Sequence, residues 1–145
     1  MNENIREMTA SDKTAVLEMM RDFYSSPAVF TNGSEEIFNR DIDNCIGDCP
    51  FVEGYVFDGG DTLQGYAMLA KSYSTEFGRE CIWIEDIYIK PKFRGMGIAG
   101  GFLSFVHQKY SGAIFRLEVE EDNEGAVRLY KSCGYDFLPY AEMKK

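Results

Sequence analysis

A glycine-rich turn at residues 94–100 joins a strand-like run to a helix-like run, and few folds use such a turn. Its sequence is Arg94-Gly95-Met96-Gly97-Ile98-Ala99-Gly100. Because glycine has no side chain, the backbone can come close to a ligand there, and the first N–H groups of the following helix point toward that ligand. Together with the helix dipole and the Arg94 guanidinium, the turn predicts an anion site for a phosphate or pyrophosphate.

Two other phosphate-binding motifs need to be weighed against this sequence. Gly95-x-Gly97-x-x-Gly100 matches the dinucleotide fingerprint G-x-G-x-x-G, and Glu120 follows at the end of the next strand-like run. A dinucleotide fold, however, places its first glycine almost directly after the strand and needs a long series of parallel strands. Here residues 91–94 intervene and the preceding runs are joined by hairpin turns, so we judge the match accidental. No Gly-Lys-Ser/Thr follows, which excludes a nucleoside-triphosphate loop.

The hydrophobic pattern predicts a single α/β (α+β) domain over residues 1–145, with a mixed sheet and helices on both faces. No linker, repeat or low-complexity segment divides the chain. The predicted order is β-α-α-β-β-β-α-β-α-β. Its elements are a strand at 4–8, a helix capped by Ser11 or Asp12, a helix at 34–46, strands at 51–57, 63–72 and 80–90, a helix at 97–110, a strand at 115–120, a helix at 123–133 and a final strand at 135–140.

The charge balance and the apolar runs of the chain indicate which binding partners to expect. The chain has 15 Lys and Arg against 24 Asp and Glu, a formal net charge of −9. Proteins that follow nucleic-acid phosphates usually have the opposite balance, so DNA and RNA are not expected, whereas cations and amines are. No apolar run approaches the ~18 residues of a membrane span, and the N-terminus has no apolar signal core, so we expect a cytoplasmic protein without a membrane partner.

The cysteines do not predict a disulfide framework or a metal site. Cys45, Cys49, Cys81 and Cys133 are scattered, and His107 is the one histidine of the chain. Zinc sites favour closely spaced pairs of ligands, which this sequence lacks. We therefore expect reduced structural cysteines and no bound metal.

The glycine-rich turn resembles the pyrophosphate motif of the GCN5-related N-acetyltransferases, Arg/Gln-x-x-Gly-x-Gly/Ala, which is complete over residues 94–99. This family transfers an acetyl group from acetyl-CoA to an amine. The resemblance is close over residues 81–135, and earlier in the chain only the predicted order of elements agrees. A second family pattern is matched by Leu117, Val119, Asn123, Ala126, Tyr130 and Gly134, with Tyr135 where the family has Phe.

The resemblance implies roles for acetyl-CoA binding. The backbone N–H groups of Arg94, Gly95, Met96, Gly97, Ile98 and Ala99 would hold the pyrophosphate of acetyl-CoA. Strand residues Ile87, Tyr88 and Ile89 would separate from residues 115–120 and pair with the pantetheine arm, and an N–H near Ile87 would stabilise the oxyanion. Asn123 would touch the arm, although a plain helix cap explains it almost equally well. Tyr130 would protonate the departing thiolate, and a core tyrosine is the alternative.

Two adjacent carboxylates, Glu85 and Asp86, precede the residues implied to bind the thioester. An alkylamine with a pKa near ~10.4 must lose a proton before it attacks, and a carboxylate could accept that proton directly or through water. Because strand side chains alternate, we expect one of the two to face the site and the other to point away. Glu118 and Glu120 share a face of the next predicted strand and could extend the negative wall, or be solvated charges.

The sequence therefore predicts an acetyl-CoA-dependent N-acetyltransferase that acts on a primary amine by direct transfer in a ternary complex. The acidic residues favour a small cationic acceptor, and Glu85-Asp86 resembles the diamine and polyamine members of the family. The alternatives are a non-catalytic CoA- or nucleotide-binding regulatory module and a protein (lysine or N-terminal) acetyltransferase. Dimers are common in the resembled family, which leaves a homodimer open.

Overall fold

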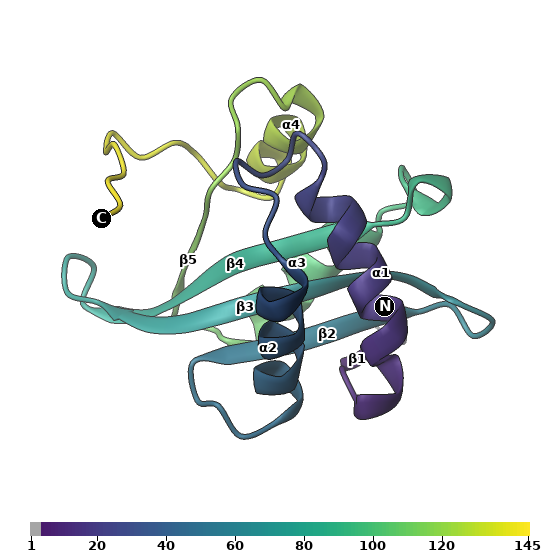
Figure 1. The fold of residues 1–145 in the computed structure, drawn as a ribbon. Helices are drawn as coiled ribbons and strands as arrows, with labels where there is room; N and C mark the ends of the chain where they lie inside the picture. Colours follow the sequence, from purple (N-terminus) through teal and green to yellow (C-terminus); the bar gives the residue numbers. More distant parts are fainter. Residues whose placement is uncertain (1–3) are drawn as a thin grey trace.

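The computed structural model describes residues 4–145 and contains one five-stranded sheet in the order β1-β2-β3-β4-β5 (Figure 1). Strands β1 to β4 pair antiparallel, and β4 and β5 pair parallel, so the predicted mixed sheet is confirmed. Along the chain the elements are β1 (Ile5–Glu7), η1 (Ala10–Asp12), α1 (Lys13–Tyr24), α2 (Glu35–Ile46), β2 (Val52–Asp58), β3 (Leu63–Ser74), β4 (Arg79–Ile89), η2 (Pro91–Phe93), α3 (Ile98–Lys109), β5 (Ile114–Leu117) and α4 (Glu124–Ser132).

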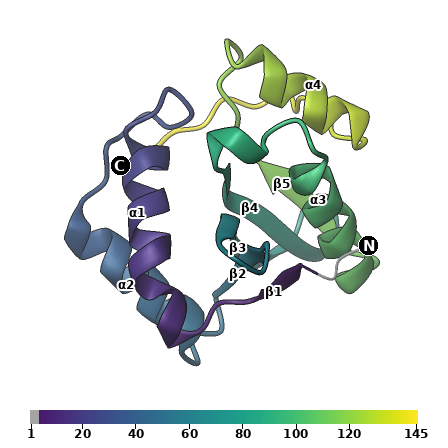
Figure 2. The ribbon, with the colours of Figure 1, turned by 90° about the vertical axis from the view of Figure 1, so that its right-hand side faces the viewer.

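Helices cover both faces of the sheet, as the sequence predicts. Figure 2 shows α1 and α2 on one side of the sheet and α3 on the other. The apolar stripes of α1 and α2, which include Val16, Met20 and Ile42, pack on the sheet face that carries Tyr66 and Tyr88. On the opposite face lies a second cluster, made by Phe102, Leu103, Val106, Tyr55, Phe57, Leu69 and Ile82. Because both faces are buried, the edges and ends of the sheet are the places left for a ligand.

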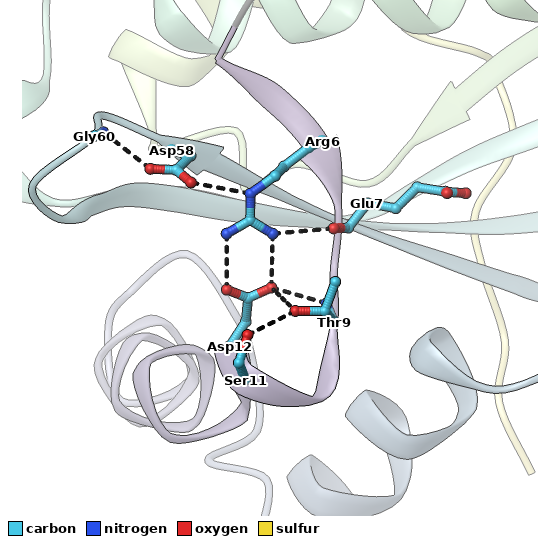
Figure 3. Close-up of polar contacts among 7 residues, drawn as sticks. All are labelled: Arg6, Glu7, Thr9, Ser11, Asp12, Asp58 and Gly60. Atoms are coloured by element: carbon cyan, nitrogen blue, oxygen red, sulfur yellow. Dashed lines mark hydrogen bonds and ion pairs between the residues drawn. The ribbon is translucent and has the colours of Figure 1, made fainter.

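A charged cluster fastens β1 to its surroundings (Figure 3). The Arg6 guanidinium donates two hydrogen bonds of 2.9 Å to the buried carboxylate of Asp12 and one of 3.0 Å to Asp58, the last residue of β2. Asp12 precedes α1, where the sequence predicts a cap, but its carboxylate accepts from the Thr9 N–H (2.8 Å) and from Arg6 instead of capping that helix. The hydrogen bond from Arg6 lowers the pKa of Asp12, so the pair stays ionised.

The predicted final strand at 135–140 is wrong. Within residues 4–145 this segment forms no strand, and β5 ends at Leu117 instead of residue 120. A strand needs a backbone partner, and here side chains hold the segment instead: the Tyr135 hydroxyl is 2.8 Å from His107 Nε2 on α3, and the Tyr140 hydroxyl donates to Glu76 over 2.6 Å. Of the aromatic residues that predict a strand, Tyr135 packs partly buried near α3, whereas Phe137 and Tyr140 are exposed.

The helices in residues 4–145 are all too short or too polar to cross a lipid bilayer.

Candidate functional site

An extra residue in β4 shapes the site. Asp86 pairs with Met68 of β3 while Ile84 pairs with Leu69, so Glu85 has no partner of its own. Such a β-bulge interrupts the alternation of side chains and bends the strand. Because Glu85 is the extra residue of the bulge, simple alternation does not describe this part of β4, and both Glu85 and Asp86 line the same cleft.

Beyond the bulge, β4 separates from β5. Their parallel pairing joins Cys81–Ile84 to Ile114–Leu117 and stops there. Residues 87–89 continue to pair with β3 on one side but have no ladder to residues 118–120 on the other. This separation, which the family resemblance implies, leaves backbone groups of β4 turned toward an opening between the strands.

The opening belongs to a cleft of about 940 Å³. One wall comes from the end of α1 and the segment after it, the floor from β3 and β4, and the other wall from residues 118–123 and α4. The cleft brings together five of the predicted site residues, namely Glu85, Asp86, Ile87, Asn123 and Tyr130. Tyr88, Ile89 and residues 94–99 lie outside its lining.

Asp86 is the buried carboxylate of the cleft, with 3% of its surface exposed. It accepts hydrogen bonds from the hydroxyl groups of Tyr66 (2.7 Å) and Tyr24 (2.9 Å). Burial raises its pKa to about 6, against the opposing effect of the two hydrogen bonds. Sequence reasoning missed Tyr24 and Tyr66, because nothing local in the sequence pairs α1 with a carboxylate 62 residues later.

Glu85 and Glu118 are more open to water than Asp86. The Glu85 side chain is exposed at the cleft, yet the surrounding walls remove enough water to raise its pKa. The neighbouring carboxyl group of Glu142 raises the pKa of Glu118 to about 7. Glu120 also lines the cleft. Glu142, which the sequence analysis does not single out, lines the cleft together with these carboxylates.

Tyr130 of α4 lies where the cleft meets a second hollow of about 740 Å³ that runs along β5. Burial raises its pKa to about 12, so the hydroxyl keeps its proton at neutral pH. Among residues 4–145 no group hydrogen-bonds to this hydroxyl, although the ring packs into the cluster under α3. A protonated phenol beside the strand separation can donate a proton into the cleft.

Asn123 caps α4. Its side-chain oxygen accepts from the Ala126 N–H over 3.3 Å, which is the plain cap weighed above. The cap does not use the amide NH2 group of Asn123, and that group can still meet a ligand in the cleft.

The glycine-rich turn has the backbone that an anion site requires. Gly95 and Gly97 adopt φ values of 79° and 82°, in the left-handed region that favours glycine. A Cβ placed on either residue would meet no protein atom within 4 Å, so this side of the turn is open for a ligand. Gly97 immediately precedes α3, whose first N–H groups have no partner within the helix. The turn therefore fits a pyrophosphate group.

Comparison with known proteins identifies the family. The sequence model of the acetyltransferase (GNAT) family matches residues 14–135. Thialysine N-epsilon-acetyltransferase from Sus scrofa is 33% identical over 95% of this chain and 86% of its own length. The crystal structure of a possible acetyltransferase from Clostridium difficile 630 superposes with a TM-score of 0.81 at 16% identity, over 97% of this chain and 95% of the other. The aminoglycoside N-acetyltransferase AAC(6')-Iy in complex with CoA has a TM-score of 0.80 at 12% identity, over 97% and 92%. The chain belongs to the GNAT family and is an N-acetyltransferase.

Proposed function

We propose that this protein transfers the acetyl group of acetyl-CoA directly to the primary amine of a small cationic molecule. The observation that carries the proposal is the cleft in which Glu85, Asp86 and Tyr130 lie beside the separated end of β4. The residues to which we assign roles all belong to this chain, which is in keeping with a single catalytic domain.

Two backbone segments of the chain would bind acetyl-CoA. The N–H groups of residues 94–99 would hold the pyrophosphate, and the unpaired side of residues 87–89 would bind the pantetheine arm as an added strand. An N–H near Ile87 would then stabilise negative charge on the thioester oxygen. Acetyl-CoA supplies the activated acetyl group.

Glu85 is the better candidate for the base. Its carboxylate is exposed to the cleft and has a raised pKa, so it can take a proton from an incoming ammonium group directly or through water. Asp86 is held by Tyr24 and Tyr66 on the cleft floor. From there its charge attracts a cation without reaching far into the cleft.

Tyr130 would act as the acid. A phenol with a pKa of about 12 carries its proton at neutral pH, so it could donate that proton as negative charge develops on the departing sulfur. The position of Tyr130, where α4 borders the strand separation, supports this role.

The acceptor should carry positive charge. Eight acidic residues line the cleft: Asp41, Glu85, Asp86, Glu118, Glu120, Glu121, Asp122 and Glu142. The relative from Sus scrofa is named for the N-epsilon amine of thialysine. Both observations favour an amine on a short flexible chain that bears a further charged group.

The test is acetyl transfer itself. Purified protein is incubated with acetyl-CoA and with thialysine, lysine, a polyamine, an aminoglycoside, a neutral alkylamine or a peptide with a free N-terminus, and the released thiol is followed. We expect the small cationic amines to react fastest. Binding of acetyl-CoA without transfer to any amine would favour the non-catalytic module, and the fastest transfer to the peptide would favour a protein acetyltransferase.

Tyr130→Phe removes only the hydroxyl and shows whether transfer uses this site. We expect turnover to fall by roughly 10²–10⁴-fold with little change in CoA affinity, because positioned proton transfer contributes about that factor. Tyr73→Phe is the matched control, since Tyr73 is an exposed tyrosine of β3 outside the cleft. Equal turnover in the two variants would return Tyr130 to a packing role.

A further inference from the structure

The side chain of Tyr88 faces away from the opening between β4 and β5. It is buried on the α1 side of the sheet, where its ring lies 6.3 Å from the ring of Phe23 and 6.1 Å from that of Tyr66. Its hydroxyl donates a hydrogen bond to the carboxylate of Asp22 on α1. The proposed binding of pantetheine uses only the backbone of Tyr88. It therefore does not explain the contacts of the Tyr88 side chain.

The other neighbour of the Tyr88 ring is Arg94, the first residue of the glycine-rich turn. The Arg94 Cζ atom lies 5.5 Å from the ring centroid, within the range of a cation–π contact. The Arg94 Nε donates to the Ile89 carbonyl over 2.7 Å. The guanidinium is thus fixed at two points, one on the backbone of β4 and one on the face of a tyrosine.

Arg94 has no acidic partner among residues 4–145, although the chain carries 24 Asp and Glu. Its two terminal nitrogens keep their N–H groups for another acceptor, and an arginine whose fork is already oriented loses less freedom when it binds phosphate. A carboxylate partner would compete with that phosphate. An aromatic face does not, because it orients the cation and leaves the fork available.

We propose that the Tyr88 ring is a platform that positions Arg94 for the phosphate groups of CoA, and that Asp22 keeps this ring in place. Tyr88 is then a positioning residue that acts through Arg94. The inference rests on the proposed function, because it needs CoA phosphate at the glycine-rich turn. It adds two side chains, Tyr88 and Asp22, that neither the motif nor the cleft identifies.

The experiment is calorimetric titration of CoA at one fixed ionic strength into the wild type, Tyr88→Leu, Tyr88→Phe, Arg94→Ala and the double variant Tyr88→Leu/Arg94→Ala. We expect Arg94→Ala to weaken CoA binding by about tenfold or more, as for loss of charge-assisted hydrogen bonds. Tyr88→Leu should weaken it about two- to fivefold, the size of an exposed cation–π contact. Tyr88→Phe should recover most of that loss, since it keeps the ring.

The double variant separates positioning from mere packing. If Tyr88 acts through Arg94, the double variant binds CoA as weakly as Arg94→Ala and no weaker. Additive losses would overturn the inference, and so would unchanged affinity in Tyr88→Leu. Tyr73→Leu, which removes an exposed tyrosine elsewhere on the sheet, serves as the control and should bind CoA as the wild type does.

Asp22→Ala covers the case in which Tyr88→Leu fails to fold. Asp22 is exposed on α1, so the change should leave the core intact while it frees the Tyr88 hydroxyl. We expect a smaller loss of CoA affinity that disappears in the Arg94→Ala background, and a loss that persists there would contradict the inference. A wild type that does not bind CoA would instead refute the proposed function.

Discussion

At the scale of single residues, two neighbouring carboxylates on one strand meet different surroundings. Glu85 and Asp86, at the bulge, both line the cleft, where Asp86 accepts hydrogen bonds from two tyrosine hydroxyls and Glu85 is exposed. An exposed carboxylate is better placed than a hydrogen-bonded, buried one to exchange a proton with an amine and with water, which is the reason for proposing Glu85 as the base. Adjacent residues of one type can thus have different tasks because the backbone between them is irregular.

The first prediction concerns Glu85→Gln. A base works only when it is deprotonated, so wild-type turnover should fall as pH drops through the raised pKa of Glu85. The variant should lose turnover by roughly 10²-fold at pH 7 and regain much of it as pH approaches the ~10.4 of a free alkylamine. Steady-state kinetics with a cationic amine over this pH range measure both effects.

Asp86→Asn is the comparison for Glu85→Gln. It removes a charge from the cleft floor but no exposed base, so it should raise the Michaelis constant of the amine more than it lowers turnover. If Asp86→Asn instead shows the large loss of turnover with recovery at high pH, the two roles are exchanged.

At the scale of elements, the sequence predicts the helices and the first strands well because their hydrophobic periods are local. The glycine-rich turn and the cap at Asn123 are also where the motif places them. The bulge at Glu85 escapes prediction, since it is a mismatch of register between β3 and β4 and neither strand contains it alone. The predicted strand at 135–140 is wrong for a related reason, because a strand forms only where it can pair with the edge of another strand.

The residues of the candidate site also fall into a group that the sequence predicts and a group that it does not. Residues on the motif and on β4 can be named from the sequence, because their order along the chain carries the information. Packing between distant segments brings the remaining groups to their places. These are the hydroxyl groups of Tyr24 and Tyr66, the carboxylate of Glu142 and the Asp22–Tyr88 contact. Periodicity shows only that such residues share a face with a core.

The second prediction concerns the close contact of β3 with β4. A Cβ added to Gly65 would lie 2.1 Å from the Tyr88 carbonyl oxygen and 2.9 Å from the Phe57 ring, so the strands would have to move apart. We expect Gly65→Ala to lower the free energy of unfolding by about 1–3 kcal/mol or more. Urea denaturation measures this change.

Gly101→Ala is the matched substitution for Gly65→Ala. Gly101 lies inside α3, and an added Cβ there meets no atom within 4 Å. The free energy of unfolding should rise by about 0.5–1 kcal/mol, because alanine loses less backbone freedom than glycine in a helix. Equal effects of the two substitutions would mean that the spacing of β3 and β4 is not fixed by Gly65.

At the scale of the whole molecule, carboxylates on the two faces of the sheet have pKa values shifted in opposite directions. On the α1 side, burial raises the pKa of Asp86 to about 6. On the α3 side, burial opposes the charge of Glu53, but hydrogen bonds from Tyr110, Tyr55 and Lys71 outweigh it and lower the pKa to about 2. One carboxylate is set to change its charge near neutral pH, and the other to remain ionised.

These shifts give opposite dependences of stability on pH, which is the third prediction. The folded state holds the Asp86 proton more tightly than the unfolded chain, so this contribution is full below the unfolded value of 3.8 and is lost as pH rises through about 6. Glu53 contributes stability to the folded state above its unfolded pKa of 4.5, and this contribution is lost as pH falls toward about 2.

From pH 3 to 7, the unfolding free energy of the wild type should fall relative to Asp86→Asn and rise relative to Glu53→Gln. Each change should be on the order of 2 kcal/mol, since one pKa unit corresponds to about 1.4 kcal/mol. Urea denaturation of the three proteins across this range measures both differences. Slopes of the same sign would show that one of the two carboxylates does not have the surroundings described here.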